Sequence, residues 1–154
     1  MSDAPKGLLP PEPATGRVYR QDVLIRFAYC DPAGIVFFPR YLELCNNLIE
    51  DWSRDELGFS FAEIHKGHGW GLPTVHLDVN FFAPSFIGEV LAASLSVRKV
   101  GTSSFGVTIL FRGPDNMDRV RTLATLVLTD PITRRAMKIP DHLKARIQAF
   151  HASS

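Results

Sequence analysis

The chain turns from a strand-like segment into a helix-like one through Tyr29-Cys30-Asp31-Pro32-Ala33-Gly34-Ile35-Val36-Phe37-Phe38-Pro39-Arg40-Tyr41. Asp31-Pro32 favours a turn, because the residue before a proline is pushed towards extended backbone. Gly34 supplies either a positive φ or room for a neighbouring backbone or ligand. Pro39 suits the first turn of a helix, where a missing N–H costs nothing. The stretch predicts a strand-to-helix corner with the Asp31 carboxylate at its start.

This corner has the parts that acyl-transfer chemistry needs. The free N–H groups at the start of the helix face back towards the loop and favour negative charge. A carboxylate beside them can attack a carbonyl carbon or activate water, while the N–H groups hold the developing oxyanion. From these residues alone, an ordinary Asp-Pro turn at Asp31 is the competing interpretation.

The pattern Cys30-Asp31-x-x-Gly34-Ile35-Val36-x-Phe38-x-x-Tyr41 resembles the signature of the 4-hydroxybenzoyl-CoA thioesterase family of hot-dog-fold enzymes. The likeness is close over this motif and looser, through the order of elements, over roughly residues 20–150. The resemblance implies thioester hydrolysis, with Asp31 as nucleophile or general base and the Phe38 N–H as the oxyanion donor. With the whole motif present, we favour a catalytic role for Asp31.

Two positions bear on the acyl group. Some relatives carry histidine where this chain has Phe38, and phenylalanine cannot act as an acid or base, which favours an aryl-CoA over a short-chain substrate. The 4-hydroxybenzoyl-CoA enzymes carry an acid, near the ring hydroxyl, at about the position of Asn46. Asparagine there leaves room for benzoyl-CoA or another ring pattern. Alternatively, Asn46 caps a turn or faces solvent.

The remaining site assignments are hypotheses of the same kind. Phosphate groups recruit arginine, lysine or backbone N–H groups, and the competing interpretation of each basic residue is a solvated surface charge. His76 either lines the acyl pocket or is half exposed on its strand. We assign substrate binding to Gly34, Ile35, Asn46 and His76, and CoA binding to Arg98, Lys99 and Arg112.

Other nucleophiles and ligands are weaker candidates. Cys30 would need a nearby base to become a reactive thiolate, and we interpret it as a packing residue. His65 and His68 are spaced as metal ligands sometimes are, but no third ligand follows in a fitting pattern. We therefore expect neither a metal nor another cofactor, and hydrolysis of a thioester requires none.

The order of elements predicts an α+β fold. Residues 39–57 have apolar side chains at helical spacing, and period-two alternation predicts strands over 18–28 and 74–82. Their content of Val, Leu, Thr and Phe predicts three more strands, at 89–100, 103–112 and 119–129. A sixth short strand is expected at residues 135–139, before a terminal helix that starts at Pro140-Asp141. An antiparallel sheet of five or six strands wrapped around the long helix is the hot-dog arrangement. Its edge strand invites pairing into a dimer, and the resemblance adds a dimer of dimers.

Length and composition limit the number of domains and the classes of partner. The 154 residues suit one domain, which we place at 16–154 after a flexible, proline-containing extension at 1–15. With 17 basic and 16 acidic residues, nothing favours nucleic acid or an anionic membrane as a partner. No apolar run reaches the roughly 18 residues of a membrane-spanning helix. Two cysteines in unlike contexts predict no disulfide framework and favour a cytoplasmic location.

Three functions remain open at this stage. The first is hydrolysis of an aryl-CoA thioester of the 4-hydroxybenzoyl-CoA or benzoyl-CoA type. The second is an enzyme of the same fold that acts on short-chain or fatty acyl-CoA. The third is a non-catalytic module that binds acyl groups, for which Asp31 would be dispensable.

Overall fold

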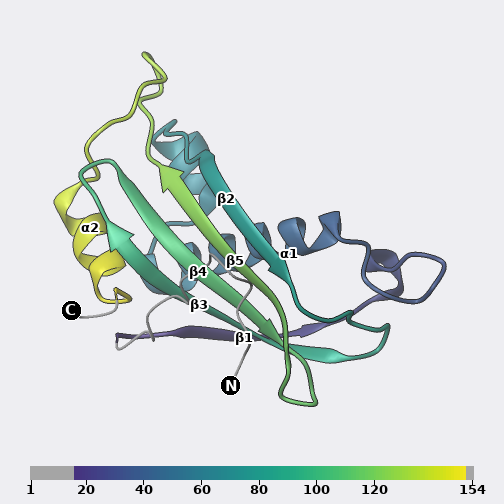
Figure 1. Ribbon diagram of the computed structural model, residues 1–154. Coiled ribbons are helices and arrows are strands. Elements are labelled where there is room, and N and C mark those ends of the chain that lie inside the picture. The colour runs from purple at the N-terminus through teal and green to yellow at the C-terminus, as the bar shows by residue number, and fades with distance from the viewer. Residues whose placement is uncertain (1–15, 152–154) are drawn as a thin grey trace.

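The computed structural model of the protein describes residues 16–151, so the extension expected at 1–15 lies outside the described residues. The main elements are β1 Tyr19–Leu24, α1 Pro39–Trp52, β2 Thr74–Phe81, β3 Val90–Val100, β4 Ser104–Arg112, β5 Asp118–Val127 and α2 Asp141–Gln148. Within residues 16–151 the strands form one five-stranded antiparallel sheet in the order β1-β3-β4-β5-β2. Figure 1 shows α1 lying along this sheet, and the α+β prediction is confirmed.

One face of the sheet packs on α1. Alternate side chains of β3 are buried, as expected for a strand with one face against the core: Leu91, Ala93, Leu95 and Val97. The helix buries the matching stripe of Tyr41, Leu44, Cys45, Leu48, Ile49 and Trp52. Because each fully buried aliphatic or aromatic side chain contributes roughly 1.5–3 kcal/mol, this contact is the main source of stability.

The first strand is shorter than predicted. It ends at Leu24, which pairs with Val90, the first residue of β3. The chain then makes a short 3₁₀ turn at Phe27–Tyr29. Beyond Leu24, Ile25 still keeps backbone hydrogen bonds to the neighbouring segment: its N–H donates to the Glu89 carbonyl at 2.8 Å, and its carbonyl accepts the Gly88 N–H at 2.9 Å. The 3₁₀ turn then ends the extended backbone.

The central helix is α-helical only to Trp52. Ser53–Leu57 continues it as a wider π-type turn, and Gly58 ends it with a left-handed φ of 76°. The Ser53 hydroxyl donates to the Phe59 carbonyl at 2.6 Å, which holds the chain as it leaves the helix. The predicted range 39–57 therefore covers an α-helix and a π-type turn.

The sixth strand is the one element that does not form. Residues 135–139 contribute only an isolated bridge between Thr129 and Ala136. The preceding turn is closed by the Asp130 carboxylate, which accepts the N–H groups of Ile132 and Thr133. Arg134 takes a positive φ of 58° and ends this turn directly before the predicted strand.

The two ends of α1 are different. Figure 1 shows α2 near the end of α1 that is opposite the loop leading into it. There the Trp52 ring meets the Phe150 ring at 5.7 Å between centroids. The other end, where Pro39 begins α1, stays open to solvent beside the Asp31 loop. Among residues 16–151, no helix combines the length and the apolar character required to cross a bilayer.

Candidate active site

Asp31 sits in a tight turn that its own side chain helps to hold. The Gly34 N–H donates to the Asp31 carbonyl at 2.9 Å, and the Asp31 N–H donates to the Ile35 carbonyl at 2.9 Å. Oδ1 of the carboxylate accepts the Ala33 N–H at 2.8 Å. Gly34 takes a φ of 78°, a conformation that glycine adopts without strain. Among the described residues, the second carboxylate oxygen has no hydrogen-bond partner.

An open pocket gives ligands access to this carboxylate. It has a volume of about 290 Å³ and is lined by Ala28, Cys30, Asp31, Pro32, Phe37 and Arg40. The pocket is large enough for part of a substrate, whereas most of a CoA thioester would extend beyond it. Asp31 therefore has the access that a catalytic carboxylate needs.

The backbone at the start of α1 leaves one amide unused. The Phe37 N–H donates to the Tyr29 carbonyl at 2.9 Å, and the first helical residue, Pro39, has no N–H. Within residues 16–151 the Phe38 N–H between them donates to no protein acceptor. An unpaired amide at a helix N-terminus is suited to hold a negatively charged oxygen.

Aromatic side chains form a wall beside this end of the helix. The Phe38 ring lies 5.5 Å from the Phe37 ring and 6.3 Å from the Phe81 ring, measured between centroids. Tyr41 lies 5.9 Å from Phe81 beneath them. The Phe38 side chain is 60% exposed, so this wall presents apolar surface that an acyl group can cover.

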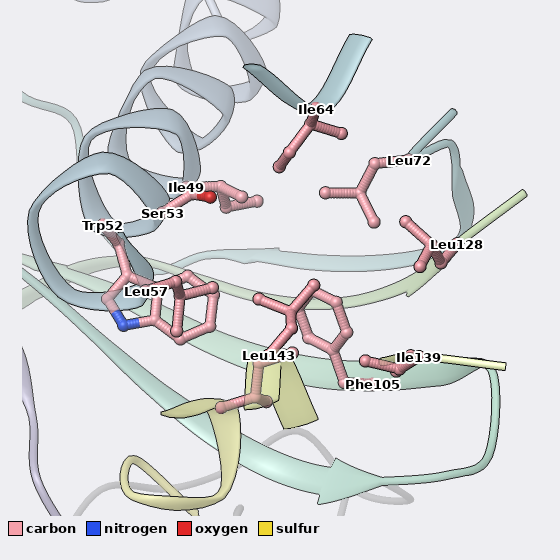
Figure 2. Close-up of a pocket in the computed structure, with 11 residues that line it drawn as sticks. Ile49, Trp52, Ser53, Leu57, Ile64, Leu72, Phe105, Leu128, Ile139 and Leu143 are labelled. Atoms are coloured by element: carbon pink, nitrogen blue, oxygen red, sulfur yellow. The ribbon is translucent and has the colours of Figure 1, made fainter. Parts of the chain in front are cut away.

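A second cavity lies at the far end of α1 and is too small for a substrate. Figure 2 shows the apolar side chains that close around it, among them Ile49, Ile64, Phe105 and Leu128. Its volume of about 10 Å³ is at the lower limit for a single water molecule. The Asp31 pocket is therefore the better candidate for ligand binding.

Some of the predicted substrate-binding residues lie near Asp31 in the structure, and others do not. Gly34 and Ile35 lie in the same loop. Asn46 is on the exposed face of α1. His76 pairs with Thr125 across the sheet, and its neighbour Leu77 pairs with the buried Ala124. Because successive side chains of a strand point to opposite faces, His76 lies on the face away from α1 and from Asp31 of the same chain.

The predicted CoA-binding residues lie elsewhere on the sheet. Arg98 runs across Gly106 towards the Thr125 hydroxyl, which its Nη2 approaches at 3.5 Å. Arg112 pairs with Asp118 at 3.0 Å. Lys99 is exposed. None of the three lines the Asp31 pocket, and their contact with CoA stays a prediction.

The basic residue at the pocket is instead Arg40, in the first turn of α1. Its guanidinium pairs with Glu43 at 2.9 Å, and both side chains are exposed. Sequence reasoning missed it although it stands inside the quoted stretch, because helical spacing indicated only the apolar side of that turn. Sequence reasoning also missed Ser85, whose carbonyl accepts the Val36 N–H, and Arg119, whose guanidinium donates to the Pro84 carbonyl, because neither residue stands in a motif.

The histidines and Cys30 have ordinary surroundings. Cys30 is half-buried at the pocket, with its thiol 3.5 Å from the Arg26 carbonyl. The His65 ring contacts the Phe61 carbonyl at 2.8 Å, and His68 stacks on Trp70 with 4.0 Å between ring centroids. In the part of the chain that the structure describes, no group of three or more histidine, cysteine or acidic side chains is placed to hold a metal ion.

Comparisons with known proteins place this geometry in a family. Residues 25–147 match the family model described as the Thioesterase-like superfamily. A 1,4-dihydroxy-2-naphthoyl-CoA hydrolase of Acaryochloris marina is 29% identical over 128 residues, which cover 82% of this chain and 93% of that protein.

Solved structures show the same fold. A 1,4-dihydroxy-2-naphthoyl-CoA thioesterase from Synechocystis matches with a TM-score of 0.78 at 23% identity, covering 85% of this chain and 96% of that one. A Staphylococcus aureus protein solved in complex with CoA matches with a TM-score of 0.81 at 12% identity, covering 88% of this chain and 84% of that one.

These matches confirm the hot-dog fold and the thioesterase resemblance at the level of the superfamily. The relatives named above do not bear the 4-hydroxybenzoyl-CoA name that the motif resembles, so that narrower assignment is not confirmed. The chain belongs to the Thioesterase-like superfamily, and it is a thioester hydrolase built on the hot-dog fold.

Proposed function

We propose that the protein hydrolyses an aryl-CoA thioester to the free acid and CoA. The observation that carries this proposal is the Asp31 pocket beside the unpaired Phe38 amide and the aromatic wall of Phe37, Phe38 and Phe81. A flat ring packs well on such edge-to-face aromatic surfaces. The names of the relatives favour a two-ring, 1,4-dihydroxy-2-naphthoyl-type group over 4-hydroxybenzoyl.

In the proposed reaction the thioester carbonyl lies between the Asp31 carboxylate and the Phe38 N–H. Either the carboxylate attacks the carbonyl carbon, and water then hydrolyses the resulting anhydride, or the carboxylate takes a proton from a water molecule that attacks. In both routes the C–S bond breaks, the sulfur leaves with the bonding electron pair, and CoA takes up a proton as the thiol. The Phe38 N–H donates to the oxyanion, an interaction whose loss typically costs about 10²–10³-fold in rate.

A panel of CoA thioesters tests the proposal by release of free thiol. We expect saturation at micromolar concentrations of an aryl-CoA, with 1,4-dihydroxy-2-naphthoyl-CoA, benzoyl-CoA and 4-hydroxybenzoyl-CoA compared directly. Preference for butyryl-CoA or palmitoyl-CoA would instead favour the short-chain or fatty acyl enzyme, which the same apolar wall also accommodates. If Asp31→Asn behaves as the wild type with every substrate, the chain is an acyl-binding module.

We also propose a homodimer formed through the edge of β2. Within residues 16–151 this strand pairs with β5 on one side only, and its apolar side chains Val75, Leu77 and Phe81 are exposed. The Phe81 ring lies 6.3 Å from the ring of the exposed Phe38, measured between centroids. An unpaired edge flanked by apolar surface favours a second copy of the same strand. Assembly of two such dimers remains a further prediction.

The remaining proposals concern the whole chain. We place one hot-dog domain at residues 16–154, with 1–15 as an extension. The two cysteines are free, one half-buried and one buried, which supports a reducing, cytoplasmic location. The balance of 17 basic against 16 acidic residues supports an acyl-CoA partner without nucleic acid or membrane.

A further inference from the structure

Ser85, in the turn after β2, contacts both halves of the candidate active site. It is fully buried, at 0% exposure. Its carbonyl accepts the Val36 N–H at 2.9 Å, at the end of the Asp31 loop. Its hydroxyl accepts the Tyr41 hydroxyl hydrogen at 2.7 Å, and Tyr41 stands in the first turn of α1. One residue thus joins the loop that carries the carboxylate to the helix end that carries the unpaired amide.

Arg119, on β5, contacts Ser85 and its neighbour Pro84 and fixes their position. Its side chain is only 5% exposed. Nη1 donates to the Pro84 carbonyl at 2.8 Å and approaches the Ser85 hydroxyl oxygen at 3.5 Å. The guanidinium also donates to both carboxylate oxygens of Glu89, at 2.9 and 3.2 Å. A two-pronged pair of this kind fixes orientation as well as distance.

The segment from Pro84 to Glu89 is hydrogen-bonded to the Asp31 loop and supports its backbone. Glu89 accepts the Phe86 N–H at 2.6 Å, which closes the segment on itself. The Ile87 N–H donates to the Gly34 carbonyl at 3.0 Å, and Ile35 forms a bridge with Phe86. The loop meets this rigid segment at three successive positions, 34–36, just after its flexible glycine.

We infer that Ser85, held by Arg119, is a positioning residue that sets the spacing between the Asp31 carboxylate and the Phe38 N–H. This inference rests on the proposed function. Between those two groups the chain has Gly34 and a turn, which alone leave the spacing adjustable. The Tyr41–Ser85–Val36 connection removes that freedom. Displacement of reacting groups by about 1 Å can cost about 10²-fold in rate.

Near-isosteric variants separate positioning from general stability. Tyr41→Phe removes only the hydroxyl that donates to Ser85, and Ser85→Ala removes only the hydroxyl that accepts it. The matched control is Thr122→Val, because Thr122 is also 0% exposed and its hydroxyl joins α1 to the sheet through Cys45 Sγ at 3.5 Å. All three variants delete one buried hydroxyl from the contact between α1 and its surroundings.

We expect Tyr41→Phe and Ser85→Ala each to lower kcat by about 10- to 100-fold while KM changes by less than about threefold. The double variant should lose no more than Ser85→Ala alone, because both substitutions break one hydrogen bond. Thr122→Val should keep kcat within about twofold of wild type, with a comparable drop in Tm.

Three results would overturn the inference. They are an unchanged kcat in Tyr41→Phe and Ser85→Ala despite a lowered Tm, an equal loss of kcat in Thr122→Val, or fully additive losses in the double variant. Asp31→Asn is measured in parallel on the best substrate. If it retains turnover, the proposed function fails, whereas loss in Asp31→Asn with no loss in Tyr41→Phe rejects the role of Ser85 alone.

Discussion

The Asp31 carboxylate helps to close its own turn and is also the proposed catalytic group, and two substitutions tell these roles apart. One oxygen accepts the Ala33 N–H and so helps to close the turn. An asparagine oxygen can accept the same hydrogen bond, whereas alanine cannot. In the proposed reaction only a carboxylate can attack the thioester or accept a proton from water, so both variants should lose that chemistry.

We predict that Asp31→Asn loses turnover by several orders of magnitude with a nearly unchanged free energy of unfolding. Asp31→Ala should lose turnover equally and also about 0.5–1.5 kcal/mol of stability, the usual contribution of one hydrogen bond. Thiol release and urea unfolding measure the two quantities. Equal stability of both variants would show that the Ala33 hydrogen bond does not stabilise the turn.

Glu89 makes stability depend on pH. Its hydrogen bonds with Arg119 lower the pKa of the Glu89 carboxyl below its ordinary value of 4.5, although partial burial acts in the opposite direction. Because folding lowers this pKa, the contribution is complete above about pH 4.5 and is lost as the pH falls through the lower, folded-state value.

We predict that Glu89→Gln lowers the free energy of unfolding at pH 7 by about 1.5–3 kcal/mol, the range for a hydrogen bond to a charged group. The difference from wild type should shrink as the pH falls below about 4.5, because the wild-type carboxyl then also becomes neutral. Urea unfolding at a series of pH values measures it. A difference that is constant from pH 7 to pH 3 would contradict the assigned cause.

At the scale of elements, the exit from α1 depends on Gly58. Its φ of 76° is left-handed, and a Cβ there would collide with the Arg146 guanidinium. That guanidinium donates to the Leu57 carbonyl at 3.0 Å and so satisfies the end of the π-type turn. Gly67 is a matched position, since nothing lies within 4 Å of a Cβ built there and its φ is not left-handed.

We predict that Gly58→Ala lowers the free energy of unfolding by about 1–2 kcal/mol, because an L-residue in the left-handed region is strained. Gly67→Ala should change it by less than about 0.5 kcal/mol. Chemical denaturation of both variants provides the measurement. Similar values for the two would mean that the left-handed turn at Gly58 can relax without loss.

The elements themselves were largely predictable, because each depends on local periodicity. Alternation placed β2 within one residue of its observed end, and helical spacing found α1. The predicted end of the first strand was wrong because that end depends on pairing with another strand. β1 ends at Leu24, which pairs with Val90, the first residue of β3. The sixth strand failed because residues 135–139 have a strand-like composition but find only one bridge partner within residues 16–151, Thr129 opposite Ala136, and a local pattern cannot show whether a partner strand is present.

The candidate site was predictable only in its contiguous part. The loop around Asp31 and the amide of Phe38 lie in one stretch of sequence, so a motif can indicate them. The alternation that predicts the strand of His76 places its side chain on the face opposite that of Leu77, and alternation alone leaves open whether this side chain lines an acyl pocket or is half exposed. Ser85 and Arg119 come from distant segments, and their contact with the loop depends on the sheet order, which no local pattern specifies.

At the scale of the whole molecule, the two edges of the sheet differ. Leu77 on β2 and Leu24 on β1 are similarly exposed, at 43% and 45%. Leu77 pairs with the buried Ala124 and lies on the helix side of β2, the strand that also carries the exposed Phe81. Leu24 is on the opposite edge strand, β1. If β2 is the dimer edge, a charge at Leu77 is buried without a partner on association.

We predict that Leu77→Lys raises the dimer dissociation constant by at least about tenfold, consistent with a central apolar interface residue. Leu24→Lys should leave the dimer intact. Light scattering coupled to size-exclusion chromatography over a dilution series measures both. A variant Leu24→Lys that falls to the mass of one chain, with Leu77→Lys unaffected, would move the interface to β1.

The proposed donor to the oxyanion is the backbone N–H of Phe38, and the next residue, Pro39, has no N–H that could replace it. Every residue except proline keeps this N–H in place. Natural variation there can therefore alter which acyl groups fit against the wall without dismantling the chemistry. A single substitution at position 38 can therefore change the acyl-group specificity. Alanine scanning would detect the altered specificity but not the backbone N–H donor, because the scan leaves that donor in place.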